Sequence, residues 1–235
     1  MQKKPEVGPI EGNARESKLK AYLGPIVILI MLGAILFITA GSFRFWEAWI
    51  FWLQISALTL FITAYFLKKD PKLLSRRGQT KEKETTQKIP SYLATLNLFG
   101  YLIPGLDFRF HWSAVPFWVV IAANAIVFLG YTYIILVFKE NSYASTIIHV
   151  EEDQQVITTG PYAIVRHPMY TGMLLMTLFT PLALGSYWAL IPSFLLFIPY
   201  LVLRIKGEEE TLLRDLPGYK DYCLKTRYRL IPSVW

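Results

Sequence analysis

Long blocks without any charged residue alternate with polar segments along this chain. A helix needs about 20 apolar residues to cross a hydrocarbon core of about 30 Å. Three blocks have close to the required length and predict membrane-spanning helices: residues 22–40, 48–67 and 113–138. A fourth, shorter block at residues 91–106 ends with Pro104 and Gly105, so the pattern leaves open whether it crosses fully.

The last block, residues 169–203, holds 35 residues and is too long for a single crossing. Gly185 and Ser186 lie near its middle, and such a pair is typical of a turn. We therefore expect two short helices joined at this point. The predicted fold class is an all-α polytopic membrane protein with about six transmembrane helices, or with five and a re-entrant hairpin.

Lysines and arginines are distributed unevenly over the polar segments. Of the 24 basic residues, five precede the first block, eight lie in residues 68–88 and nine lie at or after Lys139. The other two, Arg44 and Arg109, fall in the connections expected on the opposite side. Because cytoplasmic connections are enriched in basic residues, we expect an integral, multi-pass membrane protein with both termini in the cytoplasm.

Composition supports this class and excludes several others. Only 17% of the residues are charged, whereas a soluble domain typically has about 25%. The net charge of +7 is explained by a basic collar facing anionic lipid headgroups, so membrane lipids and not nucleic acid are the expected partners. The single cysteine, Cys223, excludes an intramolecular disulfide framework and offers no metal cluster. About twenty polar residues precede the first block, unlike in a secretory signal peptide.

The two halves of the chain differ in character. Residues 1–138 predict a membrane scaffold of four spans, with a cytoplasmic tail and the polar connection 68–88. Residues 139–235 predict the functional region, with a helical hairpin at 168–206 and a C-terminal cytoplasmic helix. The hairpin returns the chain to the same membrane face, so the polar segments on either side of it can meet. On the far side, the sequence DFRFHWS (107–113) is typical of an interfacial aromatic belt.

The sequence RHPMYTG marks the start of the hairpin. Pro168 suits the first position of a helix, which places Arg166 and His167 just before its N-terminus. Tyr170 follows within the first turn, and Gly172 permits a close approach to the backbone. The free N–H groups and the dipole of a helix N-terminus favour an anionic ligand. The alternative is that the arginine only anchors the helix to headgroups.

A second charged group follows the hairpin. Arg204 and Glu208 are four residues apart and share one face of a helix. Glu209 and Glu210 follow directly. With the Arg-His pair opposite them, these carboxylates suit a zwitterionic ligand held at both ends, and the alternative is a surface ion pair beside two solvated acids.

Taken together, several spaced motifs resemble the isoprenylcysteine carboxyl methyltransferase family, and the related membrane phospholipid N-methyltransferases share part of the pattern. The resemblance covers roughly residues 154–235. It rests on TGPYAIVRHPMYTG, on R-x-x-x-E-E-x-x-L at Arg204, Glu208, Glu209 and Leu212, and on GYKDY and YRLIP.

The resemblance implies an enzyme that transfers a methyl group from S-adenosylmethionine, bound at the cytoplasmic face under the hairpin, to a carboxylate or other nucleophile of a lipophilic, lipid or prenylated acceptor. It implies catalytic, substrate-facing roles for Arg204 and Arg166. No G-x-G-x-x-G turn occurs, so a Rossmann-type cofactor site is not expected. The cofactor-binding residues implied are Gln155, Val156, Ile157, Tyr162, His167, Pro168, Met169, Tyr170, Glu208 and Glu209.

Three alternatives remain open at this point. A lipid amine or a small thiol fits the same cofactor site as a carboxylate acceptor. The ending YCLKTRYRLIP also resembles the C-terminal part of membrane sterol reductases, which use NADPH. A membrane protein that keeps the architecture without the activity is the third alternative.

Overall fold

The computed structural model describes residues 11–78 and 88–235, and of residues 11–20 it describes the backbone alone. The predicted N-terminal tail and part of the connection 68–88 therefore lie outside the described residues. Within them the chain is helical and contains no strand, which confirms the all-α prediction. The elements are, in order, α1 (Glu11–Ala40), α2 (Trp46–Lys69), α3 (Pro71–Arg77), α4 (Lys88–Phe99), α5 (Leu102–Phe110), α6 (Phe117–Glu140), η2 (Gly160–Ala163), α7 (Pro168–Ala183), α8 (Leu190–Pro192), the π-helical η3 (Ser193–Phe197), α9 (Ile198–Asp215) and α10 (Tyr219–Lys225).

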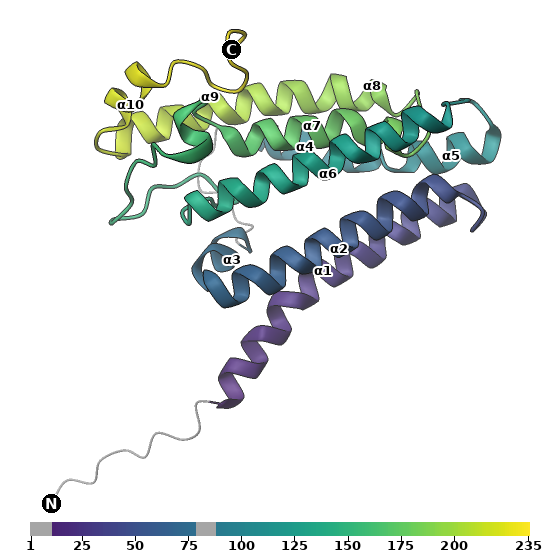
Figure 1. The fold of residues 1–235 in the computed structure, drawn as a ribbon, viewed down its shortest axis with the longest axis horizontal. Coiled ribbons are helices and arrows are strands. Elements are labelled where there is room, and N and C mark those ends of the chain that lie inside the picture. Colours follow the sequence, from purple (N-terminus) through teal and green to yellow (C-terminus); the bar gives the residue numbers. More distant parts are fainter. Residues whose placement is uncertain (1–10, 79–87) are drawn as a thin grey trace, which may run out of the picture.

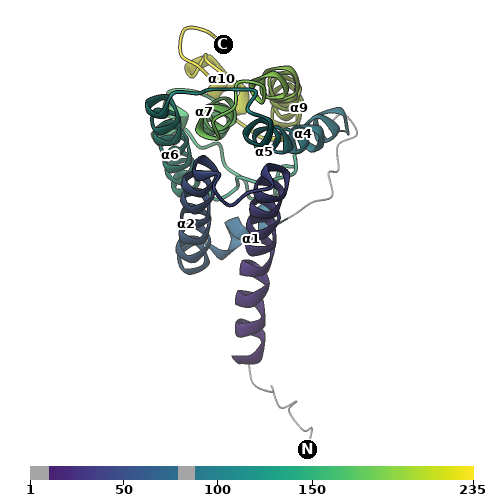
Figure 2. The same cartoon turned by 90° about the vertical axis from the view of Figure 1, so that its right-hand side faces the viewer.

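The long helices run side by side between two ends of the molecule (Figure 1). The α1–α2, α5–α6 and α7–α8 connections lie at one end, whereas α3, the segment 141–167 and α10 lie at the other. Viewed along the helices, α1 and α2 lie on one side, and α4, α5, α6 and α9 gather around α7 on the other (Figure 2). The chain segments on either side of the hairpin thus come to the same end, as the sequence predicts.

Four helical stretches in the described residues are long and apolar enough to cross a membrane: Ala21–Ala40, Trp46–Lys69, Phe117–Glu140 and Leu190–Asp215. Many of their large apolar side chains face outward, for example Ile38, Leu129 and Leu195, as expected of helices surrounded by lipid. The hairpin prediction is confirmed, because α7 and the α8–α9 helix are separate. The count of six spans stays a prediction, since α7 has 16 residues and the α4–α5 segment is broken into helices of 12 and nine residues.

Two glycines set the distance between α6 and α7. A Cβ atom on Gly172 would lie 2.6 Å from Cγ1 of Ile134 and 3.0 Å from the carbonyl oxygen of Gly130. A Cβ atom on Gly130 would in turn lie 3.1 Å from the carbonyl oxygen of Gly172. Small residues at such a crossing allow close packing of membrane helices. The close approach predicted at Gly172 is therefore that of a neighbouring helix.

A buried acid fastens the far end of the hairpin. The turn after α7 contains Gly185 with φ +69°, a conformation that suits glycine. Both oxygens of Asp107 accept hydrogen bonds there, from the backbone N–H and the hydroxyl of Ser113, each at 2.7 Å, and from the hydroxyl of Ser186 at 2.5 Å. The segment 107–113 is therefore more than an aromatic belt, because its aspartate is buried.

Candidate functional site

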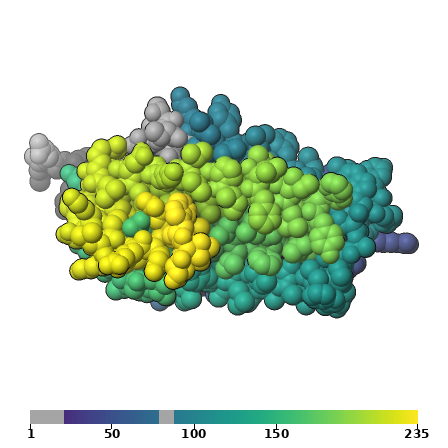
Figure 3. All heavy atoms as spheres, turned by 90° about the horizontal axis from the view of Figure 1, so that it is seen from above, coloured from purple at the N-terminus to yellow at the C-terminus, as the bar shows by residue number. Residues whose placement is uncertain are grey.

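The Arg-His pair is held in place by the C-terminal segment. The backbone N–H groups of Arg166 and His167 donate to the carbonyl oxygens of Tyr228 and Arg229, both at 2.9 Å. α7 begins with Pro168 directly after this short pairing, as predicted. The YRLIP motif thus has a structural role next to the RHP motif, and its residues lie over this end of the molecule (yellow in Figure 3).

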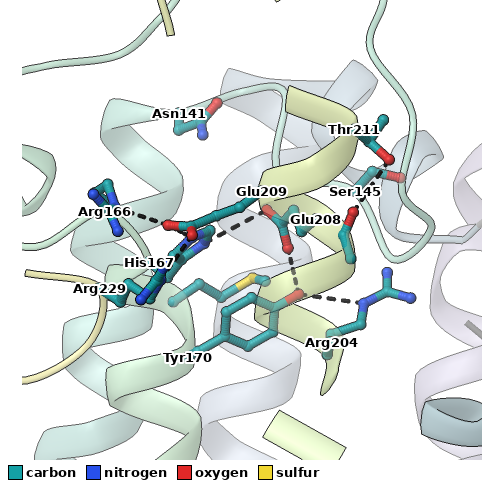
Figure 4. Close-up of polar contacts among 12 residues, drawn as sticks. Asn141, Ser145, Arg166, His167, Tyr170, Arg204, Glu208, Glu209, Thr211 and Arg229 are labelled. Carbon is teal, nitrogen blue, oxygen red and sulfur yellow. Dashed lines mark hydrogen bonds and ion pairs between the residues drawn. The ribbon is translucent and has the colours of Figure 1, made fainter. Parts of the chain in front are cut away.

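Glu209 joins three basic side chains. Its carboxylate lies 2.8 Å from Nε of Arg166, 3.3 Å from Nε2 of His167 and 2.7 Å from Nε of Arg229. The side chains of Arg166, His167 and Glu209 are only 9%, 3% and 8% exposed. Figure 4 shows this cluster on one side of α9. It fixes the start of α7 against α9 and against the C-terminal segment.

Tyr170 bridges the predicted Arg204 and Glu208 pair. Its hydroxyl donates to Oε2 of Glu208 at 2.6 Å and accepts from Nε of Arg204 at 3.3 Å. Nη2 of Arg204 donates to the carbonyl oxygen of Thr146 at 2.7 Å. Nδ1 of His167 lies 3.8 Å from Oε1 of Glu208. The two predicted charged groups therefore meet at one place (Figure 4).

A pocket opens beside these residues and contains about 820 Å³ of empty space, part of it open to solvent. Two predicted site residues, Pro168 and Glu209, are not in its wall. The others line it: Gln155, Val156, Ile157, Tyr162, Arg166, His167, Met169, Tyr170, Arg204 and Glu208.

Part of the wall was not predicted from the sequence. The segment after α6 and helix α10 also line the pocket, with Asn141, Tyr143, Ser145, His149, Tyr219 and Tyr222 among others. The amide of Asn141 donates to the hydroxyl of Tyr162 at 2.8 Å, and the hydroxyl of Tyr222 donates to the carbonyl oxygen of Tyr162 at 2.7 Å. Burial raises the pKa of both tyrosines, so their hydroxyls stay protonated. The GYKDY motif carries Tyr219 and Tyr222 and was the available signal for α10.

Three buried polar atoms of the wall lack a hydrogen-bond partner among the described residues. One is Nε of Arg166, which instead lies in an ion pair with Glu209, and the others are Nδ1 of His149 and the hydroxyl of Tyr219. Buried polar groups are normally paired, and an unpaired one in a pocket calls for an explanation such as a ligand. The atoms of His149 and Tyr219 suit a ligand with several polar groups.

Helix α3 holds the outer wall from the scaffold half of the chain. Nε and Nη2 of Arg76 donate to the two carboxylate oxygens of Glu151 at 2.6 and 2.5 Å, a bidentate pair. Nη1 of Arg76 donates to the carbonyl oxygen of Ser142 at 2.8 Å. The connection 68–88 thus contributes to the site, which its polar composition alone did not indicate.

Comparison with known proteins gives matches of three kinds. Residues 118–216 match the family described as phospholipid methyltransferase. Over 85 residues the chain is 35% identical to Delta(14)-sterol reductase TM7SF2 of Mus musculus. This match covers 35% of the chain and spans 20% of the length of that relative.

The third match is to a solved structure, the eukaryotic intramembrane Ras methyltransferase ICMT (isoprenylcysteine carboxyl methyltransferase). The TM-score is 0.55 at 19% identity, and the alignment covers 88% of this chain and 74% of that one. At this identity the likeness establishes a shared fold. The match over residues 118–216 and the shared fold both support the family of membrane methyltransferases that the motifs predicted. The apolar helices support an integral membrane protein.

Proposed function

We propose that this protein transfers a methyl group from S-adenosylmethionine to a lipophilic acceptor at the cytoplasmic face of a membrane. One observation carries the proposal. Tyr170 follows the RHP motif in the first turn of α7, and Glu208 belongs to the Arg204–Glu208 pair of α9. These two residues are 38 positions apart in the sequence, yet they hydrogen-bond to each other beside a single pocket. The family match over residues 118–216 supports methyl transfer as the chemistry.

The pocket suits the proposed cofactor. S-adenosylmethionine carries an amino acid group, a sulfonium and a nucleoside, and the wall offers a matching mixture of charged, aromatic and backbone groups. The Glu208 carboxylate is the candidate partner for its ammonium group. His149 and Tyr219 each supply a buried polar atom that has no hydrogen-bond partner among the described residues, and the segment 155–157 supplies backbone groups for the nucleoside.

When bound, S-adenosylmethionine supplies a methyl group on a positively charged sulfur. Rings such as that of Tyr170, together with backbone carbonyls, favour a neighbouring cation. Holding acceptor and methyl group in line is worth about 7–11 kcal/mol of the barrier, and this alignment is the protein's main task. A carboxylate or thiolate acceptor attacks without losing a proton, so His167 is assigned to binding and orientation. Arg204 is assigned to the acceptor, while Arg166 is engaged by Glu209.

The test is direct. Purified protein is incubated with S-adenosylmethionine carrying a labelled methyl group and with a membrane extract, and the labelled product is identified. We expect label in a lipid-soluble product and saturable binding of S-adenosylmethionine. An absence of cofactor binding by correctly folded protein would refute the proposal.

The sequence identity to a sterol reductase favours a second candidate, an NADPH-dependent reduction. Binding of NADPH and of S-adenosylmethionine to the same preparation separates the two functions. Saturable NADPH binding without S-adenosylmethionine binding would favour the reductase. An acceptor amine and an acceptor carboxylate differ in their pH profiles, because the amine must lose a proton before it attacks.

A further inference from the structure

The chain that follows α10 lies on the outside of the bundle and ends against a membrane-spanning helix. Trp235 packs against a cluster that includes Phe197 and Leu201, and both residues belong to the apolar stretch Leu190–Asp215. Figure 3 shows the atoms of this part of the chain (yellow) on the surface beside those of α7 and α9 (green). Residues 226–235, the C-terminal segment, therefore lie where a spanning helix leaves the hydrocarbon region.

Large apolar side chains of this region point away from the protein. Leu224 at the end of α10 is 71% exposed, Val234 is 74% exposed, and Ile231 is exposed as well. The loop that carries Ile231 and Val234 is closed, because the carbonyl oxygen of Trp235 accepts from the N–H groups of residues 229, 230 and 231 at 2.9, 2.9 and 3.2 Å. These side chains are thus held outward beside a spanning helix, a place that suits the boundary between headgroups and acyl chains.

Basic side chains accompany the apolar ones. Residues 219–235 contain Lys220, Lys225, Arg227 and Arg229 against a single acid, Asp221. Apart from Arg229, these basic residues are exposed. Exposed basic and apolar side chains in one segment are typical of surfaces that bind anionic lipid headgroups. An acidic protein would match the charges, but it would not account for apolar side chains exposed next to a spanning helix.

The same segment orients the start of α7. The backbone N–H groups of residues 166 and 167 donate to the carbonyl oxygens of residues 228 and 229, and the hydroxyl of Thr171 donates to the carbonyl oxygen of Leu230 at 2.8 Å. Three hydrogen bonds therefore join residues 228–230 to the RHP motif and to the first turn of α7. Whatever orders the C-terminal segment also orders this wall of the pocket.

We propose that α10 and the C-terminal segment form a binding surface for anionic headgroups of the surrounding membrane, and that lipid bound there orders residues 228–230 and the RHP motif. Leu224, Ile231 and Val234 enter the apolar layer just below the headgroups, while Lys225 and Arg227 contact the phosphates. The consequence for the cofactor rests on the proposed function: S-adenosylmethionine binds more tightly when the membrane is anionic.

The test uses the full chain in lipid nanodiscs of phosphatidylcholine alone or of phosphatidylcholine mixed with phosphatidylglycerol. Hydrogen exchange of the peptides containing residues 166–171 and 226–235 reports their order, and calorimetric titration reports the affinity for S-adenosylmethionine. The variants are K225Q/R227Q, which removes two exposed charges, and V234S, which removes an exposed apolar side chain. The matched control is K68Q/K69Q, which removes two exposed charges from α2 at the same end of the molecule.

We expect both peptides of wild type and of K68Q/K69Q to exchange more slowly in the anionic nanodiscs. Coupling between two sites typically amounts to about 5- to 150-fold, so S-adenosylmethionine should bind about fivefold or more tightly there than in phosphatidylcholine alone. K225Q/R227Q should lose most of this difference but keep the wild-type affinity in phosphatidylcholine, and V234S should lose part of it. Added salt should reduce the difference in wild type, because it screens exposed charges.

Equal exchange of the two peptides, or equal cofactor affinity, in both kinds of nanodisc would overturn the inference for wild type. So would equal losses in K225Q/R227Q and K68Q/K69Q, because the effect would then follow the total charge of the protein and not this surface. Slower exchange in the anionic nanodiscs without any binding of S-adenosylmethionine refutes the proposed function and supports the lipid surface, so the two failures are distinguishable.

Discussion

At the scale of single residues, two adjacent glutamates of α9 have different surroundings. Successive residues of an α-helix are rotated by about 100°. Glu208 therefore faces the pocket and Tyr170, whereas Glu209 faces Arg166, His167 and the C-terminal segment. The spacing of Arg204 and Glu208 was enough to predict that they share a face. The bridging hydroxyl of Tyr170 was not predictable, because it comes from another helix.

Replacing Glu208 tests its place at the cofactor. In E208Q the side chain keeps an oxygen for the hydroxyl of Tyr170 but loses its charge. We expect the affinity for S-adenosylmethionine, measured by calorimetric titration, to fall roughly tenfold or more. The unfolding temperature should change little. The matched control is E210Q, since Glu210 is exposed on the same helix. Equal losses in both variants would contradict a specific role for Glu208.

Replacing Glu209 tests a structural role. E209A leaves the buried side chains of Arg166 and His167 without their carboxylate, and removing one partner of a buried ion pair costs about 3–5 kcal/mol. We expect a strongly lowered unfolding temperature in detergent. D215A is the control, because the Arg214–Asp215 pair is exposed and such pairs contribute about 0–1 kcal/mol. An unchanged unfolding temperature in E209A together with weaker cofactor binding would instead return Glu209 to the cofactor site.

At the scale of elements, α3 and the segment 141–159 show what sequence analysis could not find. The pairing of Arg76 with Glu151 joins residues 75 positions apart, and neither hydrophobic periodicity nor composition reports such a contact. By contrast, the start of α7 at Pro168 followed from local rules, because proline at the first helical position depends on its neighbours alone.

The Arg76–Glu151 pair gives the outer wall a pH dependence. The hydrogen bond from Arg76 lowers the pKa of Glu151 below its ordinary value of 4.5. The contribution of the pair is therefore complete above pH 4.5 and is lost as the pH falls below that value and through the lowered pKa. Hydrogen exchange of the segment 143–157, corrected for the intrinsic rate, should rise in this range in wild type. In R76A the exchange rate of this segment should already be raised at neutral pH, and it should change less than in wild type as the pH falls.

The contact between α6 and α7 allows a second test of an element. Gly172→Leu places a side chain where a Cβ atom alone would lie 2.6 Å from Ile134. Overpacking of this kind costs about 1–3 kcal/mol, and we expect a lower unfolding temperature and weaker cofactor binding as α7 moves. The matched control is Gly24→Leu, because nothing lies within 4 Å of a Cβ atom on Gly24. An equal response of the two variants would show that the close contact is unimportant.

At the scale of the whole molecule, the direction of the chain through the membrane can be measured by labelling. In a C223S background, Lys72 of α3 and Trp112 after α5 are each replaced by cysteine, since both are exposed. We expect W112C to react with an impermeant maleimide in intact cells, and K72C to react only after permeabilisation. This result requires the α4–α5 segment to cross, as the count of six spans demands. Labelling of both from one side would refute that count.

The sequence predicted more of the architecture than of the pocket, and the reason is physical. Hydrophobic blocks and basic residues respond to the membrane, which acts on every segment separately. The blocks therefore indicated α1, α2, α6 and the hairpin. The pocket depends on contacts between distant segments, so the motifs located about half of its wall and missed the segment 141–149 and α3.

The pairing of residues 166–167 with residues 228–229 has a consequence for synthesis of the protein. Tyr228 and Arg229 follow α1 to α9 in the chain, so the strip that orients Arg166 and His167 leaves the ribosome only after those helices. A nascent chain interrupted at α10 would be inserted in the bilayer but would lack a formed pocket. Any ligand of that pocket therefore binds only chains whose translation has passed Arg229.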